Sequence, residues 1–166
     1  MKTYKNMRFE PVTEADVAEL TAIMKRAFDA DALLHIGKRG GPPGYDNGEF
    51  IRKWALHPDA TSYKISDENG AIGMLILWID GKTKENHLGT IVIDETFENQ
   101  GLGKDVWDFV EREYPDTRVW RTETPIYSHR NHNFYVNKLG FHVVRIENPR
   151  EWTSGEGQFQ LEKRMK

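Results

Sequence analysis

The stretch that decides the fold reads IVIDETFENQGLGK, residues 91–104: an apolar strand, a short turn with two glycines, and the start of a helix. The strand pattern extends back to Leu88, and the helix keeps one apolar face until Pro115 stops it. The first turn of a helix presents unpaired backbone N–H groups and the positive end of the helix dipole, and glycines let an anion approach closely. The stretch therefore predicts a site for a phosphate or diphosphate group.

Two other phosphate-binding loops do not fit these residues. A P-loop needs Ser or Thr after its lysine and an earlier glycine five residues before Gly103, but Asp105 follows Lys104 and residue 98 is glutamate. A dinucleotide fingerprint needs a third glycine where this chain has Val106. The pattern leaves one alternative open, in which Gly101 and Gly103 merely permit a tight turn.

Composition bounds the class of protein. A chain of 166 residues fits one domain, residues 1–166, and a net charge of -3 without long Lys or Arg runs argues against a nucleic-acid partner. The absence of cysteine excludes disulfides, thiolate metal sites and a cysteine nucleophile. The longest apolar run, residues 74–79, is too short for a membrane span, so we expect a soluble, cytoplasmic protein with no membrane partner.

The order of elements follows from hydrophobic periodicity and turn signals. Turn signals at Asn69-Gly70 and Asp80-Gly81 join three successive strands into an antiparallel meander ahead of the glycine turn. The expected strands are at residues 7–12, 62–66, 71–79, 87–95, 118–122, 141–146 and 158–163, and the expected helices begin after Thr13, at Phe50, at Leu102 and at Asn131.

This order, with the glycine turn and the segment FYVNKLGF at residues 134–141, resembles the GNAT superfamily of N-acetyltransferases. The resemblance covers nearly the whole chain. It implies a mixed α/β (α+β) fold, with a central, twisted, mostly antiparallel sheet of six to seven strands flanked by about four helices. It also implies transfer of an acetyl group from acetyl-CoA to a primary amine of a small molecule or peptide, by direct attack in a ternary complex.

The chain departs from the family pattern at two places. Glu98 and Asn99 stand where the family commonly has Arg or Gln and a glycine. Because backbone N–H groups hold the diphosphate, we expect only modestly weaker binding, with Glu98 pointing away. FYVNKLGF also carries one residue more than the family's FYxKxGF, which puts Val136 at the usual tyrosine position and Tyr135 one step off.

The resemblance assigns the cofactor site residue by residue. Arg130 and Lys138 are near enough in sequence to meet the 3′-phosphate of the nucleotide, and Asn131 can serve instead as the N-cap of its helix. The cofactor-binding residues expected for acetyl-CoA are Ile91, Val92 and Ile93 along the pantetheine arm, Gln100, Gly101, Leu102, Gly103 and Lys104 at the diphosphate, and Asn131 at the coenzyme arm.

Proton transfer needs a base for the amine and an acid for the leaving thiolate. Tyr135 is the candidate acid, with ordinary helix packing as the alternative, and His87, Glu123 or a bulk-water relay is the candidate base. A backbone N–H of the bulged fourth strand can stabilise the oxyanion. The histidine spacings match no metal motif, so we expect no metal.

The loop at residues 35–45 is the expected acceptor wall. Lys38 and Arg39 favour an acceptor with a carboxylate, whereas Tyr45, Asp46 and Glu49 favour an amine, so the acceptor stays open. A homodimer is possible. Two other functions stay open: a catalytically weak CoA-binding sensor or interaction module of the same fold, and a scaffold that binds a protein through its loop.

Overall fold

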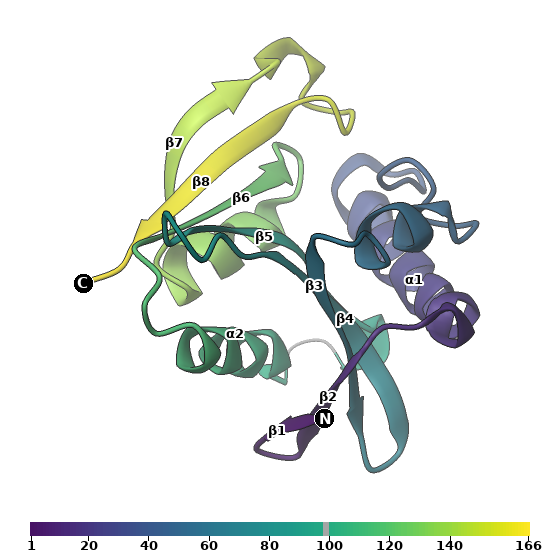
Figure 1. Ribbon diagram of the computed structural model, residues 1–166. Helices are drawn as coiled ribbons and strands as arrows, with labels where there is room; N and C mark the ends of the chain where they lie inside the picture. The colour runs from purple at the N-terminus through teal and green to yellow at the C-terminus, as the bar shows by residue number, and fades with distance from the viewer. Residues whose placement is uncertain (98–99) are drawn as a thin grey trace.

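The computed structural model describes residues 1–97 and 100–166, and the strands of this part form a single sheet with helices on both faces (Figure 1). The strands are β1 (Lys2–Tyr4), β2 (Met7–Pro11), β3 (Ala60–Asp67), β4 (Gly70–Trp78), β5 (Glu85–Ile93), β6 (Val119–Pro125), β7 (His142–Glu147) and β8 (Gln158–Arg164). The helices are α1 (Val17–Ile36), α2 (Leu102–Glu113) and α3 (His129–His132), with π-helical turns at Ile51–Ala55 and Asn133–Lys138 and 3-10 turns at Glu14–Asp16, Glu95–Phe97 and Pro149–Glu151. In this part of the chain, no helix is both long and apolar enough to cross a membrane.

The sheet has the order β1-β2-β3-β4-β5-β6-β8-β7, and each neighbouring pair is antiparallel except β5 with β6. The mixed, mostly antiparallel fold is thereby confirmed. The sheet contains one strand more than the expected upper count, because residues 2–4 fold back on β2 through a turn in which Lys5 takes a φ of 51°. The parallel pair follows from the crossover through α2, which returns the chain to the same edge of the sheet.

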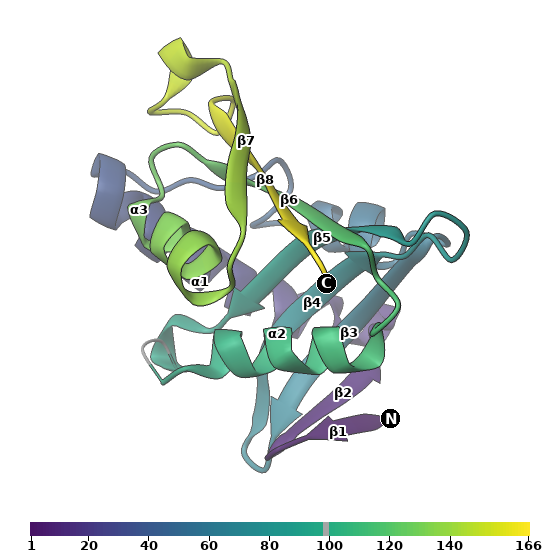
Figure 2. The ribbon, with the colours of Figure 1, turned by 90° about the vertical axis from the view of Figure 1, so that its left-hand side faces the viewer.

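Helix α1 covers one face of the sheet and α2 covers the other, as Figure 2 shows with α2 in front of the strands and α1 behind them. Successive side chains of β4 point to opposite faces of the sheet and so belong to two different cores. Met74 and Ile76 pack in the core on the α1 side, whereas Leu75 and Leu77 pack in the core on the α2 side. A strand buried on both faces reads as a continuous apolar run, which is the pattern of residues 74–79.

Strand β5 contains a β-bulge at Gly89. Its register with β4 passes from Ile76 opposite Thr90 to Leu77 opposite Leu88, so Gly89 has no partner. A Cβ at this position would lie 2.9 Å from Nε1 of Trp78, so a side chain here would displace the Trp78 ring or the strand. Because the bulge shifts the alternation by one residue, Leu88 packs in the same core as Ile91 and Ile93.

Beyond the bulge, β5 and β6 separate. Their parallel register runs only from Glu85 opposite Val119 to His87 opposite Arg121. One further contact follows, in which the Thr122 hydroxyl donates to the Leu88 carbonyl at 2.9 Å. The two strands then diverge and leave a V-shaped opening between them.

The extra residue of FYVNKLGF is absorbed by the π-helical turn. The N–H of Leu139 donates to the carbonyl of Phe134, five residues earlier, at 3.0 Å. A π turn lengthens one helical turn by one residue, and such turns occur often at functional sites. Tyr135 is therefore held in the α2-side core, 7% exposed, with its ring 5.9 Å from that of Phe141.

Candidate active site

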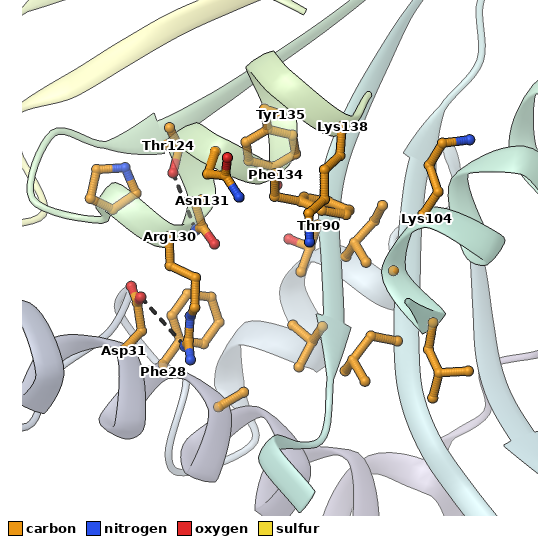
Figure 3. Close-up of a pocket in the computed structure, with 18 of the residues that line it drawn as sticks. Phe28, Asp31, Thr90, Lys104, Thr124, Arg130, Asn131, Phe134, Tyr135 and Lys138 are labelled. Carbon is orange, nitrogen blue, oxygen red and sulfur yellow. Dashed lines mark hydrogen bonds and ion pairs between the residues drawn. The ribbon is translucent and has the colours of Figure 1, made fainter. Parts of the chain in front are cut away.

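A cavity of about 310 Å³ fills the opening between β5 and β6. Its wall is made by residues 89–93 of β5, the first turn of α2, the end of β6 and the segment that follows Ser128, with α1 opposite (Figure 3). Of the residues expected from the sequence, it brings together Ile91, Val92, Ile93, Gly101, Leu102, Gly103, Lys104, Glu123, Asn131 and Tyr135. Gln100 is exposed and lies outside this lining, and the departures at Glu98 and Asn99 lie outside the described residues.

Both glycines of the turn have a local structural reason. Gly101 is the N-cap of α2 with a φ of 75°, a left-handed conformation that glycine adopts without strain. A Cβ at Gly103 would lie 2.9 Å from a ring carbon of Phe134. The first intrahelical bond is donated by Asp105 to Gly101, so the amides of residues 102–104 remain for an anion at the helix end.

The cavity carries positive charge where those amides emerge. Lys104, Arg130 and Lys138 belong to its wall, and Lys138 points into it (Figure 3). Lys104 forms an ion pair with Asp108, and Nη2 of Arg130 lies 3.5 Å from Oδ1 of Asp31. Arg130 lies beside α1, away from the start of α2 (Figure 3). Cations in a cavity that also contains a helix N-terminus are suited to a ligand with several phosphate groups.

Asn131 does not cap its helix. Helix α3 begins at His129 with Ser128 as the N-cap residue, so the capping interpretation of Asn131 was wrong. Its side-chain amide instead donates to the Thr124 hydroxyl at 3.3 Å (Figure 3). The bond ties α3 to the end of β6 at the wall of the cavity.

A second cavity, of about 920 Å³, adjoins the first. The two share Gly89 and Thr90 of β5, Glu123 and Pro125 of β6, and Phe28 of α1. They meet at the bulge, so a ligand in one can reach a ligand in the other where β5 and β6 separate.

His87 and Glu123 both line the second cavity, and Glu123 lines the first as well. His87 is half-buried, whereas Glu123 is exposed and accepts a hydrogen bond from the side chain of Gln160 at 2.8 Å. Burial lowers the pKa of His87, the charge of Glu123 raises it, and the charge of Arg121 lowers it, with a net downward shift from 6.5. The imidazole is therefore neutral at neutral pH and able to accept a proton.

Tyr135 lies at the wall of the first cavity, with most of its ring in the core. Burial raises the pKa of Tyr135 to about 12, against a lowering by the Thr122 hydroxyl, while the charge of Asp31 adds to the increase. The phenol is thus protonated at neutral pH and can act only as a proton donor.

The loop after α1 contributes backbone and prolines to the second cavity, not its charges. Helix α1 continues to Ile36 and ends at Gly37, and Gly41, Pro42 and Pro43 line the cavity. Among the described residues that line the two cavities, we do not find the five candidate acceptor residues Lys38, Arg39, Tyr45, Asp46 and Glu49. The Tyr45 hydroxyl donates to Asp29 at 2.6 Å, which fastens the loop to α1.

The sequence analysis missed Gly89, Thr90 and Phe28, which border both cavities. A glycine inside an apolar strand is a signal for a bulge, so Gly89 could have been singled out. Phe28 belongs to the apolar pattern of the helix that follows Thr13. Nothing in the local pattern distinguishes a cavity residue from a core residue there.

Two comparisons of sequence identify relatives. The Acetyltransferase (GNAT) family profile matches residues 21–141. The Bacillus subtilis (strain 168) protein YrkN is 33% identical over 140 residues, which cover 84% of this chain and 75% of YrkN.

Solved structures share the fold. An acetyltransferase from Thermus thermophilus superposes with a TM-score of 0.75 at 15% identity, covering 97% of this chain and 98% of that one. The PaiA N-acetyltransferase from Thermoplasma acidophilum, in complex with coenzyme A, gives a TM-score of 0.73 at 15% identity, covering 97% and 100%. Structural likeness at these identities concerns the fold alone.

Proposed function

This chain belongs to the GNAT family of acetyltransferases, and from that premise we propose that it is an acetyl-CoA-dependent N-acetyltransferase acting on a primary amine. The observation that carries the proposal is the meeting of two cavities at the β-bulge of β5. One cavity has cations and helix amides, and the other opens on the opposite side of Gly89 and Glu123. Two substrates could bind at once and meet there, as direct transfer requires.

The first cavity would hold acetyl-CoA. The amides of residues 102–104 would bind the diphosphate, with Lys104 and Lys138 adding positive charge. The backbone of Ile91, Val92 and Ile93 would pair with the pantetheine arm along the open edge of β5, and Asn131 would contact the arm from the other wall. Gln100, exposed at the turn, would contribute only its backbone.

The second cavity would hold the amine with its nitrogen at the bulge. The nitrogen would attack the thioester carbonyl carbon, and a backbone N–H at the bulge would stabilise the oxygen that becomes negative. His87 would take the proton lost by the amine, directly or through water, with Glu123 as the other candidate. Collapse would break the C–S bond, and Tyr135 would donate a proton to the departing sulfur.

Calorimetric titration with acetyl-CoA, followed in the same sample by a thiol-release assay over a set of primary amines, tests the proposal. We expect binding and amine-dependent release of thiol. Lys138→Glu should weaken acetyl-CoA binding about tenfold, because it reverses a charge in the cavity. Lys82→Glu, an exposed control outside both linings, should leave affinity unchanged.

Each failure has its own meaning. Absence of acetyl-CoA binding would refute the cofactor assignment. Binding without thiol release for any amine would favour a CoA-binding sensor over an enzyme. Equal affinities for the Lys138 and Lys82 variants would remove the claimed position of the phosphates.

A further inference from the structure

The two adjoining cavities differ in charge: the first has a mixed lining, and the second is acidic. Of the described residues that line the second cavity, three are glutamates and none is lysine or arginine. The first cavity is lined by three cations, Lys104, Arg130 and Lys138, together with two carboxylates, Asp31 and Glu123. The glutamates of the second are Glu123 on β6 and Glu151 and Glu156 in the connection between β7 and β8. The acidic lining of the second cavity disfavours an acceptor with a carboxylate and favours a cation.

Aromatic rings form much of the remaining wall of the second cavity. Trp54 and Trp78 meet edge to face with ring centroids 6.2 Å apart, and Phe28, Phe50 and Tyr127 complete the aromatic lining. Aromatic faces pack against aliphatic chains and attract ammonium groups. The Nζ atom of Lys53 already lies 4.7 Å from the centroid of the Trp54 ring, so that ring attracts a cation within the chain itself.

The three carboxylates divide into two places. Glu123 lies at the junction of the cavities, beside the bulge, where the reacting nitrogen would sit. Glu151 and Glu156 line the second cavity alone, on a different segment of the chain. An acceptor with one amine would use the junction and leave these two carboxylates without a counter-charge.

The segment that carries Glu151 and Glu156 is fixed by its own hydrogen bonds. The Asn148 side chain donates to the carbonyl of Glu156 at 3.0 Å, and the Ser154 hydroxyl donates to that of Glu151 at 3.1 Å. A Cβ at Gly157 would lie 2.5 Å from the Glu151 carbonyl oxygen, so the backbone is tightly packed there. Both carboxylates are thus presented from a defined turn.

We infer that the acceptor is an aliphatic diamine, with one amine at the bulge and a second, positively charged nitrogen held by Glu151 and Glu156 across an aromatic-lined channel. This inference rests on the proposed function for the identity of the reacting end. The second charge would be recognised by the electrostatic attraction of the carboxylates, and the chain between the nitrogens by Trp54 and Trp78.

The test compares ligands of equal length whose far ends differ in charge. Putrescine, butylamine and γ-aminobutyrate, together with hexamethylenediamine, hexylamine and ε-aminocaproate, are titrated calorimetrically into the protein saturated with coenzyme A. In at least one series we expect the diamine to bind at least about tenfold more tightly than the monoamine, and the amino acid to bind most weakly. The ratio should fall as salt is added.

In the double variant Glu151→Gln, Glu156→Gln, the affinity for the diamine should fall close to that for the monoamine. The affinity for the monoamine should stay unchanged. Glu68→Gln, an exposed carboxylate in the turn between β3 and β4, is the matched control and should preserve the preference. Equal binding of diamine and monoamine in both series, or a preference that survives the double variant, overturns the inference.

Failure of the proposed function has a different signature. If coenzyme A does not bind, the same titrations on the free protein still measure the preference for the second charge. A diamine preference without thiol release would retain the binding inference and refute the enzyme. Thiol release with monoamines as efficient as diamines would retain the enzyme and refute the inference.

Discussion

In the proposed function, single residues would set the proton chemistry where the cavities meet. Glu123 borders both cavities and His87 lines the second, and they come from neighbouring strands whose parallel register ends at the pair His87 opposite Arg121. Arg121 is held by Glu85 at 3.0 Å and by Glu162 at 3.2 Å, and its charge acts on His87 against protonation. Glu123 is the carboxylate whose charge acts on the imidazole in the direction of protonation.

The pH dependence of kcat should reveal the base. With His87 accepting the proton, kcat should fall as pH drops through the lowered pKa of the imidazole, hence below pH 6.5. Glu123→Gln should move this acid limb to lower pH, because it removes a charge that raises the pKa of His87. His87→Gln should abolish the limb. An unchanged limb in the His87 variant, measured by thiol release across pH, would exclude His87 as the base.

Tyr135 can be tested with a change that keeps its packing. Tyr135→Phe removes the hydroxyl and retains the ring contacts with Phe134 and Phe141. We expect kcat to fall by on the order of 100-fold, with KM for acetyl-CoA within about twofold, because a general acid acts in the transition state. Tyr114→Phe, a half-buried control outside both linings, should retain the wild-type rate. Similar rates for both variants would mean that Tyr135 only packs.

At the scale of elements, two local irregularities shape the site. The bulge at Gly89 turns β5 away from β6 and opens the junction, and the π-helical turn at Asn133–Lys138 absorbs the extra residue ahead of Gly140. Each breaks the regular hydrogen-bond ladder at one point of an otherwise regular element. Bulges and π turns are commonly retained beside functional sites for this reason.

Gly89→Ala tests the bulge. Its Cβ would approach Nε1 of Trp78 to 2.9 Å and the Ile76 carbonyl to 3.2 Å, so either the ring or the strand must move. We expect the free energy of unfolding to fall by about 1–3 kcal/mol and thiol release to drop. Gly81→Ala, whose Cβ would meet no atom within 4 Å, is the control for denaturant unfolding. Equal stability of the two variants would show that position 89 tolerates a side chain.

At the scale of the whole molecule, buried carboxylates fasten segments that are distant in sequence. Arg26 of α1 forms two hydrogen bonds with Asp94, at 2.6 and 3.2 Å, which hold α1 against the end of β5. Asp16 accepts from Lys64 of β3 at 2.8 Å. Arg26 lowers the pKa of Asp94, and Lys64 with Thr13 lowers that of Asp16 although burial alone would raise it.

Stability should therefore depend on pH in the acid range. A carboxylate with a pKa below its unfolded value of 3.8 stabilises the fold above that value, and the contribution is lost as pH falls through the folded pKa. We expect the free energy of unfolding to decline below about pH 5 as these carboxylates are protonated, in addition to a loss below about pH 7 that comes from the lowered pKa values of His87 and His132. Asp94→Asn should reduce the decline, whereas Asp59→Asn at an exposed position should not. The free energy of unfolding of both variants is measured by urea unfolding across pH. An equal decline in the two variants would contradict the role of Asp94.

The sequence by itself determined the fold class, most strand and helix positions and the glycine turn that opens α2. Those features are encoded locally, in apolar periodicity, Asn-Gly and Asp-Gly turns, and the glycines before α2. The first strand was missed because three residues are too few to show alternation. The N-cap role of Asn131 was wrong because two more residues precede it in the helix, and its side-chain amide instead donates to Thr124 at the wall of the cavity.

Only the tertiary structure decided how the site is divided. Gly89, Phe28 and the glutamates at positions 123, 151 and 156 are far apart in the chain, and no local pattern indicates that they border common cavities. Likewise, Lys38 and Arg39 stand in the loop expected to face the acceptor, yet Gly41, Pro42 and Pro43 make the wall. The physical reason is that secondary structure depends on neighbours in sequence, whereas the charge of a cavity depends on side chains from distant parts of the chain. Strand register, a bulge and a π turn bring those side chains to the same surface.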